Sequence, residues 1–178
     1  ELNIKSNFIN GLRVTDKNII SIVEEVLIEF NKEIVNALKN QSCKTRRINS
    51  KEYNIITVKP ESDKLGFVGT PTKIKTNILE EIVKYNEVPV VAPLGLDKNS
   101  QTFNINADTV AGSIAKELKA RRLMIISDVE GVLDNKKKLI PEINSLKAKE
   151  LIDQKVVSGG MIPKINNCLD VANNGVKG

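Results

Sequence analysis

The feature that most constrains the fold is the alternation of short apolar runs with amphipathic segments along the chain. After a capping residue at Thr15 or Asp16, apolar residues recur at three- and four-residue intervals, which predicts one long helix over residues 17–39. Apolar runs at residues 88–94 and 123–127 predict buried strands, the second buried on both faces. Strands and helices in alternation predict an α/β fold with a mostly parallel sheet.

The segments between these elements continue the pattern. Further strands are expected within residues 43–59 and in an edge or hairpin at residues 65–72, further helices over residues 77–85, 108–118, 145–154 (capped by Ser145) and 163–173, and a loop over residues 95–101. In sheets of this kind, ligands bind outside the carboxyl ends of the strands. Candidate functional residues are therefore expected directly after each strand.

The composition excludes several classes of site. The 178 residues include no histidine, so a Ser-His-Asp triad, a histidine general base and His-ligated zinc are ruled out within this chain. The two cysteines, Cys43 and Cys168, lie far apart and predict buried, reduced thiols rather than a disulfide. No apolar run is long enough to span a membrane and no signal peptide opens the chain, so a cytoplasmic location without membrane attachment is expected.

Charge and aromatic content argue against a nucleic-acid partner. The 27 basic residues are interleaved with 22 acidic ones, and only 3% of the residues are aromatic. A protein that stacks bases needs more aromatic side chains, and one that binds a nucleic-acid backbone needs a continuous basic surface. The balance suits a protein that handles small anions or simply stays in solution.

A polar segment leads into the helix predicted at residues 108–118. Asn104 and Asn106 would point to one face of an extended chain, where two carboxamides can donate and accept hydrogen bonds to a small polar ligand. Asp108 stands where the helix begins, and the ordinary role of an acidic residue there is to cap the first turn. The spacing alone favours this capping role over a catalytic one.

The segment after the predicted strand at residues 123–127 is a candidate nucleotide loop. Asp128 follows the strand directly and Gly131 comes soon after it, so backbone amides could face a nucleotide. An ordinary strand exit with a turn Asp and a turn Gly explains these residues equally well. The chain contains neither GxxxxGK[ST] nor GxGxxG, so a Walker loop and a dinucleotide fingerprint are both excluded.

Two basic side chains stand next to predicted helix starts. A glycine pair, Gly159 and Gly160, is followed by Pro163 at a plausible first helical position, so Lys164 stands at the start of a helix. A cation is favourable there only with an anion such as phosphate nearby. A Gly-rich turn with a surface lysine is the simpler explanation of that segment alone. Arg13, just before the long helix, could bind a carboxylate bidentately, although a lone arginine more often forms a surface ion pair.

Taken together, these segments resemble the acetylglutamate kinases of the amino acid kinase family. The matching motifs follow one another in the family's order at residues 10–16 (NGLRVTD), 31–35 (NKEIV), 65–69 (LGFVG), 90–95 (VVAPLG), 103–112 (FNINADTVAG), 127–134 (SDVEGVLD) and 158–164 (SGGMIPK). The resemblance implies a three-layer αβα sandwich with a mostly parallel central sheet, cut at both ends. Residues 1–120 would be the remainder of an acetylglutamate-binding lobe and residues 121–178 part of an ATP-binding lobe.

The resemblance also implies a reaction and its partners. The side-chain carboxylate of N-acetyl-L-glutamate would be phosphorylated by ATP, giving N-acetylglutamyl phosphate and ADP in arginine biosynthesis. That carboxylate is already ionised near neutral pH, so no general base is needed and the absence of histidine is compatible with this chemistry. Mg²⁺ would arrive on ATP rather than in a protein metal site. A homo-oligomer, a dimer or hexamer as in the family, is expected.

The resemblance assigns roles residue by residue. Arg13 would bind a carboxylate of acetylglutamate, and Asn104 would contact the same ligand with Asn106 beside it. Lys164 would stabilise charge on the transferring phosphoryl group, and Asp108 would hold catalytic ammonium groups in place. The residues that would frame ATP are Asp128, Val129, Glu130, Gly131, Val132, Leu133, Val156, Val157 and Ser158.

The chain departs from the family's pattern in three places. The first strand with its KYGG-like motif and second catalytic lysine, the Gly-rich loop after it, and the last strands and helix have no counterpart in this sequence, and the family's SGKDG stretch is replaced by residues 49–52 (NSKE). We therefore expect these 178 residues to have little or no kinase activity, and robust phosphorylation of acetylglutamate would contradict that expectation. A non-catalytic metabolite-binding or oligomer-scaffold module and an amino acid kinase with another acceptor stay open as alternatives.

Overall fold

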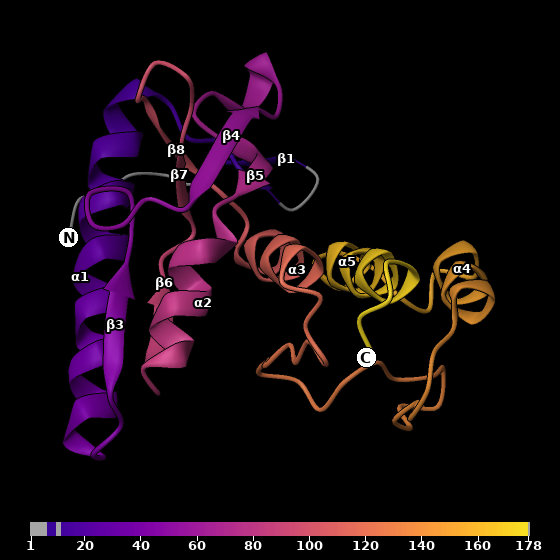
Figure 1. The fold of residues 1–178 in the computed structure, drawn as a ribbon. Helices are drawn as coiled ribbons and strands as arrows, with labels where there is room; N and C mark the ends of the chain where they lie inside the picture. Colours follow the sequence, from indigo (N-terminus) through magenta and orange to yellow (C-terminus); the bar gives the residue numbers. More distant parts are fainter. Residues whose placement is uncertain (1–6, 10–11, 178) are drawn as a thin grey trace. The chain divides into compact units, whose positions relative to one another are not determined.

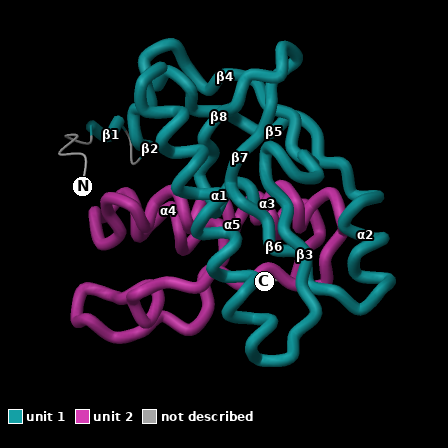
Figure 2. The backbone as a smooth tube through the Cα atoms, turned by 90° about the vertical axis from the view of Figure 1, so that its left-hand side faces the viewer, with its two compact units in different colours: residues 1–110 teal, residues 111–178 magenta. Residues whose placement is uncertain are grey.

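The computed structural model describes residues 7–9 and 12–177. The chain divides into two compact units, residues 1–110 and 111–178, which Figure 2 colours separately and Figure 1 shows with their elements labelled. The boundary falls inside the helix α3 (Ala107–Glu117). The division predicted from the resemblance, with one ligand bound by residues 1–120 and the other by residues 121–178, stays a prediction. The first two residues of the NGLRVTD motif, Asn10 and Gly11, lie outside the described residues.

The long helix of the first unit is confirmed as α1 (Lys17–Asn40). It begins at Asp16, whose carboxylate accepts hydrogen bonds from the backbone N–H groups of Asn18 (2.8 Å) and Ile19 (3.0 Å). These bonds satisfy two of the donors that every helix start leaves unpaired. Among the described residues, no helix combines the length and the apolar character needed to cross a membrane.

Helices cover both faces of a parallel strand pair in the first unit. Strand β3 (Thr45–Ile48) pairs in parallel with β6 (Val88–Val91). The Thr45 hydroxyl donates to the carbonyl of Val35 in α1, whereas the neighbouring Arg46 binds Glu87, which follows α2 (Thr76–Lys84). Adjacent strand residues point to opposite faces, so α1 and α2 lie on opposite sides of the pair. This is the layered α/β arrangement that the alternating pattern predicts, and α1 and β3 run side by side in Figure 1.

A second sheet of the first unit has the strand order β5-β4-β7-β8. Its strands are β4 (Ile56–Pro60), β5 (Gly69–Ile74), β7 (Leu94–Leu96) and β8 (Thr102–Asn104). The pair β4–β7 is parallel and the other two pairs are antiparallel, with β5 as the edge strand that the sequence predicts near residues 65–72. The loop expected at residues 95–101 is shorter, because Asp97 accepts the N–H groups of Asn99 and Gln101 and so closes a β7–β8 hairpin.

The remaining pair of strands, β1 (Phe8–Ile9) and β2 (Leu12–Arg13), is antiparallel. The core of the first unit is aliphatic, and its most completely buried large side chains are Ile48, Ile55, Ile56, Leu79, Ile82 and Leu94. Close packing of these β-branched and leucine side chains accounts for a stable unit with few aromatic residues.

The second unit is built from helices. It holds the end of α3 together with α4 (Ser145–Asp153) and α5 (Met161–Asn173). The cap of α4 is Asn144 rather than the predicted Ser145, because the Asn144 carboxamide oxygen accepts the N–H of Lys147 (2.8 Å). One core cluster of this unit is formed by Ala148, Leu151, Val157 and Ile165.

The prediction of a strand at residues 123–127 is wrong. Among the described residues the only backbone bridge near this segment joins Arg122 to Lys177, and Met124 and Ile126 are 74% and 90% exposed. Leu123 packs against a core cluster of the unit, so the exposed and covered side chains alternate. An apolar run identifies a segment that can be buried, but a strand also needs a neighbouring backbone to pair with, and the described residues of the second unit form no named strand beside it.

The prediction that both cysteines are buried is also wrong. Cys43 is half-buried and Cys168 is exposed, and the two do not form a disulfide. Cys168 lies on α5, whose apolar face is divided between the core and an open cavity described below. Residue type alone does not distinguish these two surroundings.

Candidate functional site

A cavity of about 160 Å³ in the first unit brings together the three predicted substrate-binding residues, Arg13, Asn104 and Asn106. These residues come from β2, from the end of β8 and from the residue before α3. The other side chains that line it are Phe8, Leu12, Val68 and Ile105. One cation and two carboxamides on an otherwise apolar wall suit a small anionic ligand that also carries an amide.

The position of Arg13 follows from the β1–β2 pair. Phe8 is directly opposite Arg13 in the register, and the Arg13 guanidinium lies over the Phe8 ring, 5.0 Å from its centroid. A cation–π contact of this kind uses the face of the ring and limits the positions open to the guanidinium. The in-plane N–H donors of a guanidinium are the ones that bind a carboxylate bidentately.

Asn106 is the N-cap of α3, the role that spacing suggested for Asp108. Its side-chain oxygen accepts the backbone N–H of Thr109 (3.0 Å) and the Thr109 hydroxyl (3.3 Å). Asp108 is the second residue of α3, inside the first turn, where its charge complements the helix dipole. The capping prediction for Asp108 is therefore wrong, because the cap is the last residue before the helical backbone begins and Asn106 occupies that position.

The loop at residues 65–68 joins the two sides of the cavity. Thr15 donates its backbone N–H to the carbonyl of Leu65 (3.0 Å) and accepts from the N–H of Phe67 (2.7 Å), while the N–H of Asn104 donates to the carbonyl of Phe67 (2.9 Å). Gly66 makes this approach possible. Its backbone φ is +67°, and an added Cβ would lie 2.4 Å from the Thr15 carbonyl oxygen.

Sequence reasoning did not single out Thr15 or Gly66 as part of the site. Thr15 has no exposed surface at all, and its hydroxyl donates to the carbonyl of Arg13 (3.1 Å) and accepts from the Asn104 Nδ2 (3.4 Å). The signal available in the sequence was a threonine two residues after a candidate arginine. Its partner in β8 is distant in sequence and could not be identified without the fold.

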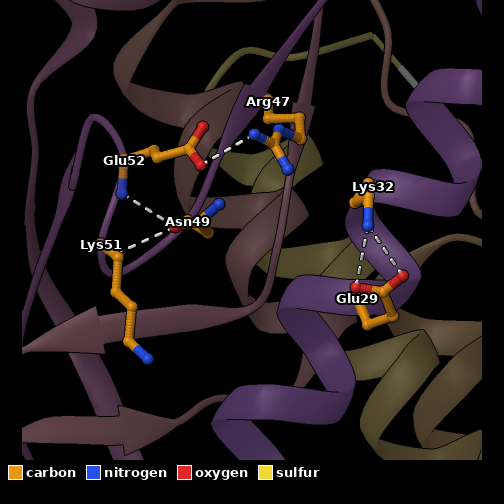
Figure 3. Close-up of polar contacts among 6 residues, drawn as sticks. All are labelled: Glu29, Lys32, Arg47, Asn49, Lys51 and Glu52. Carbon is orange, nitrogen blue, oxygen red and sulfur yellow. Dashed lines mark hydrogen bonds and ion pairs between the residues drawn. The ribbon is translucent and has the colours of Figure 1, made fainter.

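The turn at residues 49–52 is fixed by its own side chains (Figure 3). The Asn49 carboxamide oxygen accepts the N–H groups of Lys51 (2.9 Å) and Glu52 (2.8 Å), and Glu52 forms an ion pair with Arg47 (2.9 Å). The Ser50 hydroxyl donates to Glu24 in α1 (2.5 Å). An asparagine-based turn thus gives this loop a defined shape without glycines.

A second cavity, of about 260 Å³, lies within the second unit. Of the residues predicted to frame ATP, Val129, Glu130, Gly131 and Val132 line it together with Lys164. The rest of its wall is formed by Ile125, Ser127, Ile143, Met161, Ile165, Cys168 and Leu169. Its lining is mostly apolar and includes one cation, Lys164, and one carboxylate, Glu130, which suits a flat ring with polar substituents.

The other predicted ATP residues lie elsewhere in this unit. Asp128, Leu133, Val156 and Ser158 are not among the residues that line the cavity, and Val157 is 5% exposed within the core cluster around Leu151. Because the Val157 side chain is buried, only its backbone is available to a ligand. Whether these residues contact ATP stays a prediction.

The glycine pair before α5 is surrounded by open space. An added Cβ would meet no atom within 4 Å at Gly159 or at Gly160. Pro163 is the third residue of α5 rather than the predicted first, and Lys164 is the fourth, still within the first turn. The start of α5 thus offers the accessible backbone and the nearby lysine from which an anion-binding helix start is made.

Within the second unit, α3 and α5 are held together at two successive turns. The Gly112 backbone lies so close to Asn167 that an added Cβ would be 2.4 Å from the Asn167 side-chain oxygen. Lys116, one turn further along α3, forms an ion pair with Asp170. Residues spaced by four share one face of a helix, so Asp108 belongs to the same line of α3 residues as Gly112 and Lys116.

Hydrogen bonding raises the pKa of one arginine of the first unit. The Glu87 carboxylate accepts from the Arg46 Nε (2.8 Å) and from its terminal nitrogen (3.1 Å), and these bonds raise the pKa of Arg46 above its usual range.

In the part of the chain that the structure describes, no group of three or more Cys, Asp or Glu side chains is arranged to hold a metal ion.

Known proteins provide an independent comparison. The model of the amino acid kinase family matches residues 1–178. The chain is 76% identical over 177 residues to the acetylglutamate kinase of Pelagibacter ubique (strain HTCC1062), covering 99% of this chain and 62% of that protein. It is 43% identical over 191 aligned positions to the acetylglutamate kinase of Bradyrhizobium sp. (strain ORS 278), covering 99% and 64%. The chain therefore spans less than two thirds of the length of these relatives.

Solved structures share the fold. The crystal structure of smu.665 from Streptococcus mutans UA159 matches with a TM-score of 0.92 at 31% identity, covering 97% of this chain and 71% of that one. N-acetylglutamate synthase from Neisseria gonorrhoeae, solved with coenzyme A and N-acetyl-glutamate, matches with a TM-score of 0.85 at 20% identity, covering 97% and 40%. The second match is a likeness of fold alone.

Proposed function

Because the chain belongs to the amino acid kinase family, we propose that it carries the acceptor site and part of the ATP site of an acetylglutamate kinase. In the proposed reaction a carboxylate oxygen of the N-acetyl-L-glutamate side chain attacks the γ-phosphorus of ATP. The bond from that phosphorus to the bridging oxygen breaks, and N-acetylglutamyl phosphate and ADP are formed. The identity of 76% to the Pelagibacter ubique acetylglutamate kinase is the observation that carries this proposal.

The cavity of the first unit supports the acceptor assignment. Arg13 would bind a carboxylate of acetylglutamate, and Asn104 and Asn106 would supply hydrogen bonds to its remaining polar groups. Since the Asn106 oxygen already caps α3, its amide nitrogen is the atom that would serve the ligand. The apolar side chains of the same wall would exclude water from the ligand's methylene groups.

Positioning and positive charge are what phosphoryl transfer requires of these residues. Lys164 would stabilise negative charge on the transferring phosphoryl group, and Asp108 would orient catalytic ammonium groups. In support, Asp108 stands in the first turn of α3 and Lys164 in the first turn of α5. The acceptor carboxylate is ionised near neutral pH, so none of these residues has to remove a proton.

For ATP we propose the loop at residues 128–133 and residues 156–158, with the open glycine backbone before α5 next to the phosphates. The lining of the second cavity fits a nucleotide base better than it fits a metal ion, because it is mostly apolar. Mg²⁺ would be held through the phosphate oxygens, where it supplies charge neutralisation.

We further propose a cytoplasmic enzyme that assembles as a homo-oligomer. Val26 and Phe30, one turn apart on α1, are 60% and 56% exposed, so one face of this helix offers two large apolar side chains to a second copy. Sedimentation velocity over a range of concentrations tests the assembly. A strictly monomeric protein at all concentrations would contradict it.

Ligand-induced shifts in ¹H–¹⁵N spectra test the functional assignment. We expect N-acetyl-L-glutamate to shift residues around Arg13 and Asn104, and Mg·ATP to shift residues around Gly131 and Gly160. L-Glutamate, L-aspartate and carbamate serve as competing acceptors. A larger response to one of these would favour a different amino acid kinase, and a response to acetylglutamate without any to ATP would favour a non-catalytic metabolite-binding module.

A further inference from the structure

We propose that Thr15 is a positioning residue that sets the orientation of the Asn104 carboxamide toward the ligand. Its consequence for binding rests on the acetylglutamate site proposed above, whereas the hydrogen bonds themselves do not. Thr15 is fully buried and does not line the cavity, so it would act through Asn104 rather than by touching the ligand.

The direction of the hydrogen bonds determines which end of the carboxamide faces Thr15. A threonine hydroxyl has a single proton, and Thr15 donates it to the backbone carbonyl of Arg13 (3.1 Å). Toward Asn104, at 3.4 Å, the hydroxyl oxygen can therefore only accept. The nitrogen end of the Asn104 carboxamide must face Thr15, and the oxygen end must point elsewhere.

The backbone fixes both partners in place. Thr15 is bonded on both sides to the loop at residues 65–68, through the carbonyl of Leu65 (3.0 Å) and the N–H of Phe67 (2.7 Å). Asn104 donates its own backbone N–H to the carbonyl of Phe67 (2.9 Å). The backbones of Thr15 and Asn104 are thus held by the same short loop, which brings the hydroxyl next to the carboxamide and leaves the hydrogen bond between them to set the carboxamide's orientation.

The orientation defines what Asn104 offers to the cavity. With one N–H bonded to Thr15, the carboxamide keeps its Oδ1 as an acceptor and its second N–H as a donor. A ligand with a carboxylate next to an amide N–H, as in an N-acyl amino acid, presents a matching acceptor and donor. Thr15 also bonds to the main chain of Arg13, so one buried hydroxyl links the arginine and the carboxamide of the same wall.

Three variants test this role. Thr15→Val keeps the shape and removes the hydroxyl, and Thr15→Ser keeps the hydroxyl. Thr45→Val is the matched control, because Thr45 is also buried (8% exposed) and also donates to a carbonyl, that of Val35 (3.4 Å), away from the cavity. In ligand-free ¹H–¹⁵N spectra we expect the Asn104 side-chain amide signals to move in Thr15→Val and to stay in Thr15→Ser and Thr45→Val. Unchanged Asn104 signals in Thr15→Val would overturn the proposal.

Affinity provides the second readout. We expect Thr15→Val to bind N-acetyl-L-glutamate about tenfold more weakly, and Thr15→Ser to stay within about twofold of the unsubstituted chain. Equal affinity in the unsubstituted chain, Thr15→Val and Thr15→Ser would overturn the role of Thr15. An unsubstituted chain that does not bind at all would instead contradict the acetylglutamate site, and the ligand-free spectra would still test the hydrogen bond.

A measurement on the unsubstituted chain covers the case in which Thr15→Val does not fold. The side-chain amide protons of Asn104 should show a nuclear Overhauser effect to the Thr15 side chain, since the two polar atoms are 3.4 Å apart. A well-resolved Asn104 amide without this effect would overturn the proposal.

Discussion

Gly66 and Gly160 are both next to candidate binding residues, but the fold requires only the first. Gly66 has a φ of +67°, and a side chain there would meet the main chain of Thr15, which cannot move aside. Gly160 has a φ of −66°, which any residue adopts, and open space around it. A glycine that the backbone does not need is explained by something outside the fold, and a phosphate close to the main chain is one such reason.

We expect Gly66→Ala to destabilise the first unit by more than about 1 kcal/mol, because it adds left-handed strain and a contact with a backbone oxygen. Gly160→Ala should change the free energy of unfolding by less than about 0.5 kcal/mol. Chemical denaturation followed by circular dichroism measures both. Equal losses in the two variants would contradict the close contact between Gly66 and the Thr15 main chain.

The Arg46–Glu87 pair joins the starts of β3 and β6 through two hydrogen bonds. The arginine and glutamate side chains of this pair are 35% and 23% exposed, whereas those of Arg47 and Glu52, which share one ion-pair contact, are 33% and 43% exposed. A bidentate and less exposed pair stabilises more than an exposed one. Glu87→Gln should therefore lower the thermal midpoint more than the control Glu52→Gln. A larger effect of the control would contradict this ranking.

The pKa of Arg46 gives this contribution a predictable pH dependence. The folded-state pKa is raised by Glu87, so the stabilisation from Arg46 is complete below its unfolded pKa and is lost only as pH rises through the higher folded value. The unfolded-state and the folded-state pKa of Arg46 both lie far above neutral pH. The midpoint difference between the unsubstituted chain and Glu87→Gln should thus stay constant from about pH 7 to about pH 9. Thermal melts in matched buffers test this, and a steady fall across that range would contradict it.

At the level of whole elements, the periodicity of apolar residues predicted the positions of most helices and of several strands. The helices α1, α2, α3, α4 and α5 and the strands β3, β4 and β5 all lie where their apolar spacing places them, within a few residues. Caps were harder to place, because Asn106 and Asn144 precede the residues that the sequence suggested, and capping depends on where the helical backbone begins.

Long-range partners could not be predicted from the sequence. The apolar run at residues 123–127 predicted a buried strand, yet Met124 and Ile126 are exposed, and among the described residues no strand pairs with them. The same limit applied to the candidate site. Arg13 and Asn104 were identified from their motifs, but the Thr15 hydroxyl that links them depends on a pairing between distant segments.

Truncating Ile126 tests whether residues 123–127 are exposed. Ile126 is 90% exposed, so Ile126→Ala should change the free energy of unfolding by less than about 0.5 kcal/mol. Leu151→Ala, at a side chain that is 4% exposed in the same unit, should cost about 2–5 kcal/mol. Denaturant titration of both variants distinguishes an exposed segment from a buried strand, since a buried strand would make the two losses similar.

At the scale of the whole molecule, the proposed functions are divided between the two units. The cavity with Arg13, Asn104 and Asn106 lies in the first, and the cavity with Lys164 and Gly131 lies in the second. Each cavity is lined by residues of a single unit, so binding of the acceptor does not require the complete catalytic set. We therefore expect this chain to bind acetylglutamate even where its kinase activity is weak.

Isothermal titration of N-acetyl-L-glutamate into this chain tests the central claim most directly. We predict saturable binding at one site, which Arg13→Gln weakens at least about tenfold because the carboxylate loses its charged partner. The matched control Arg47→Gln, which removes an arginine paired with Glu52 outside the cavity, should leave the affinity unchanged. No binding, or equal binding by the unsubstituted chain and Arg13→Gln, would contradict the proposed acceptor site.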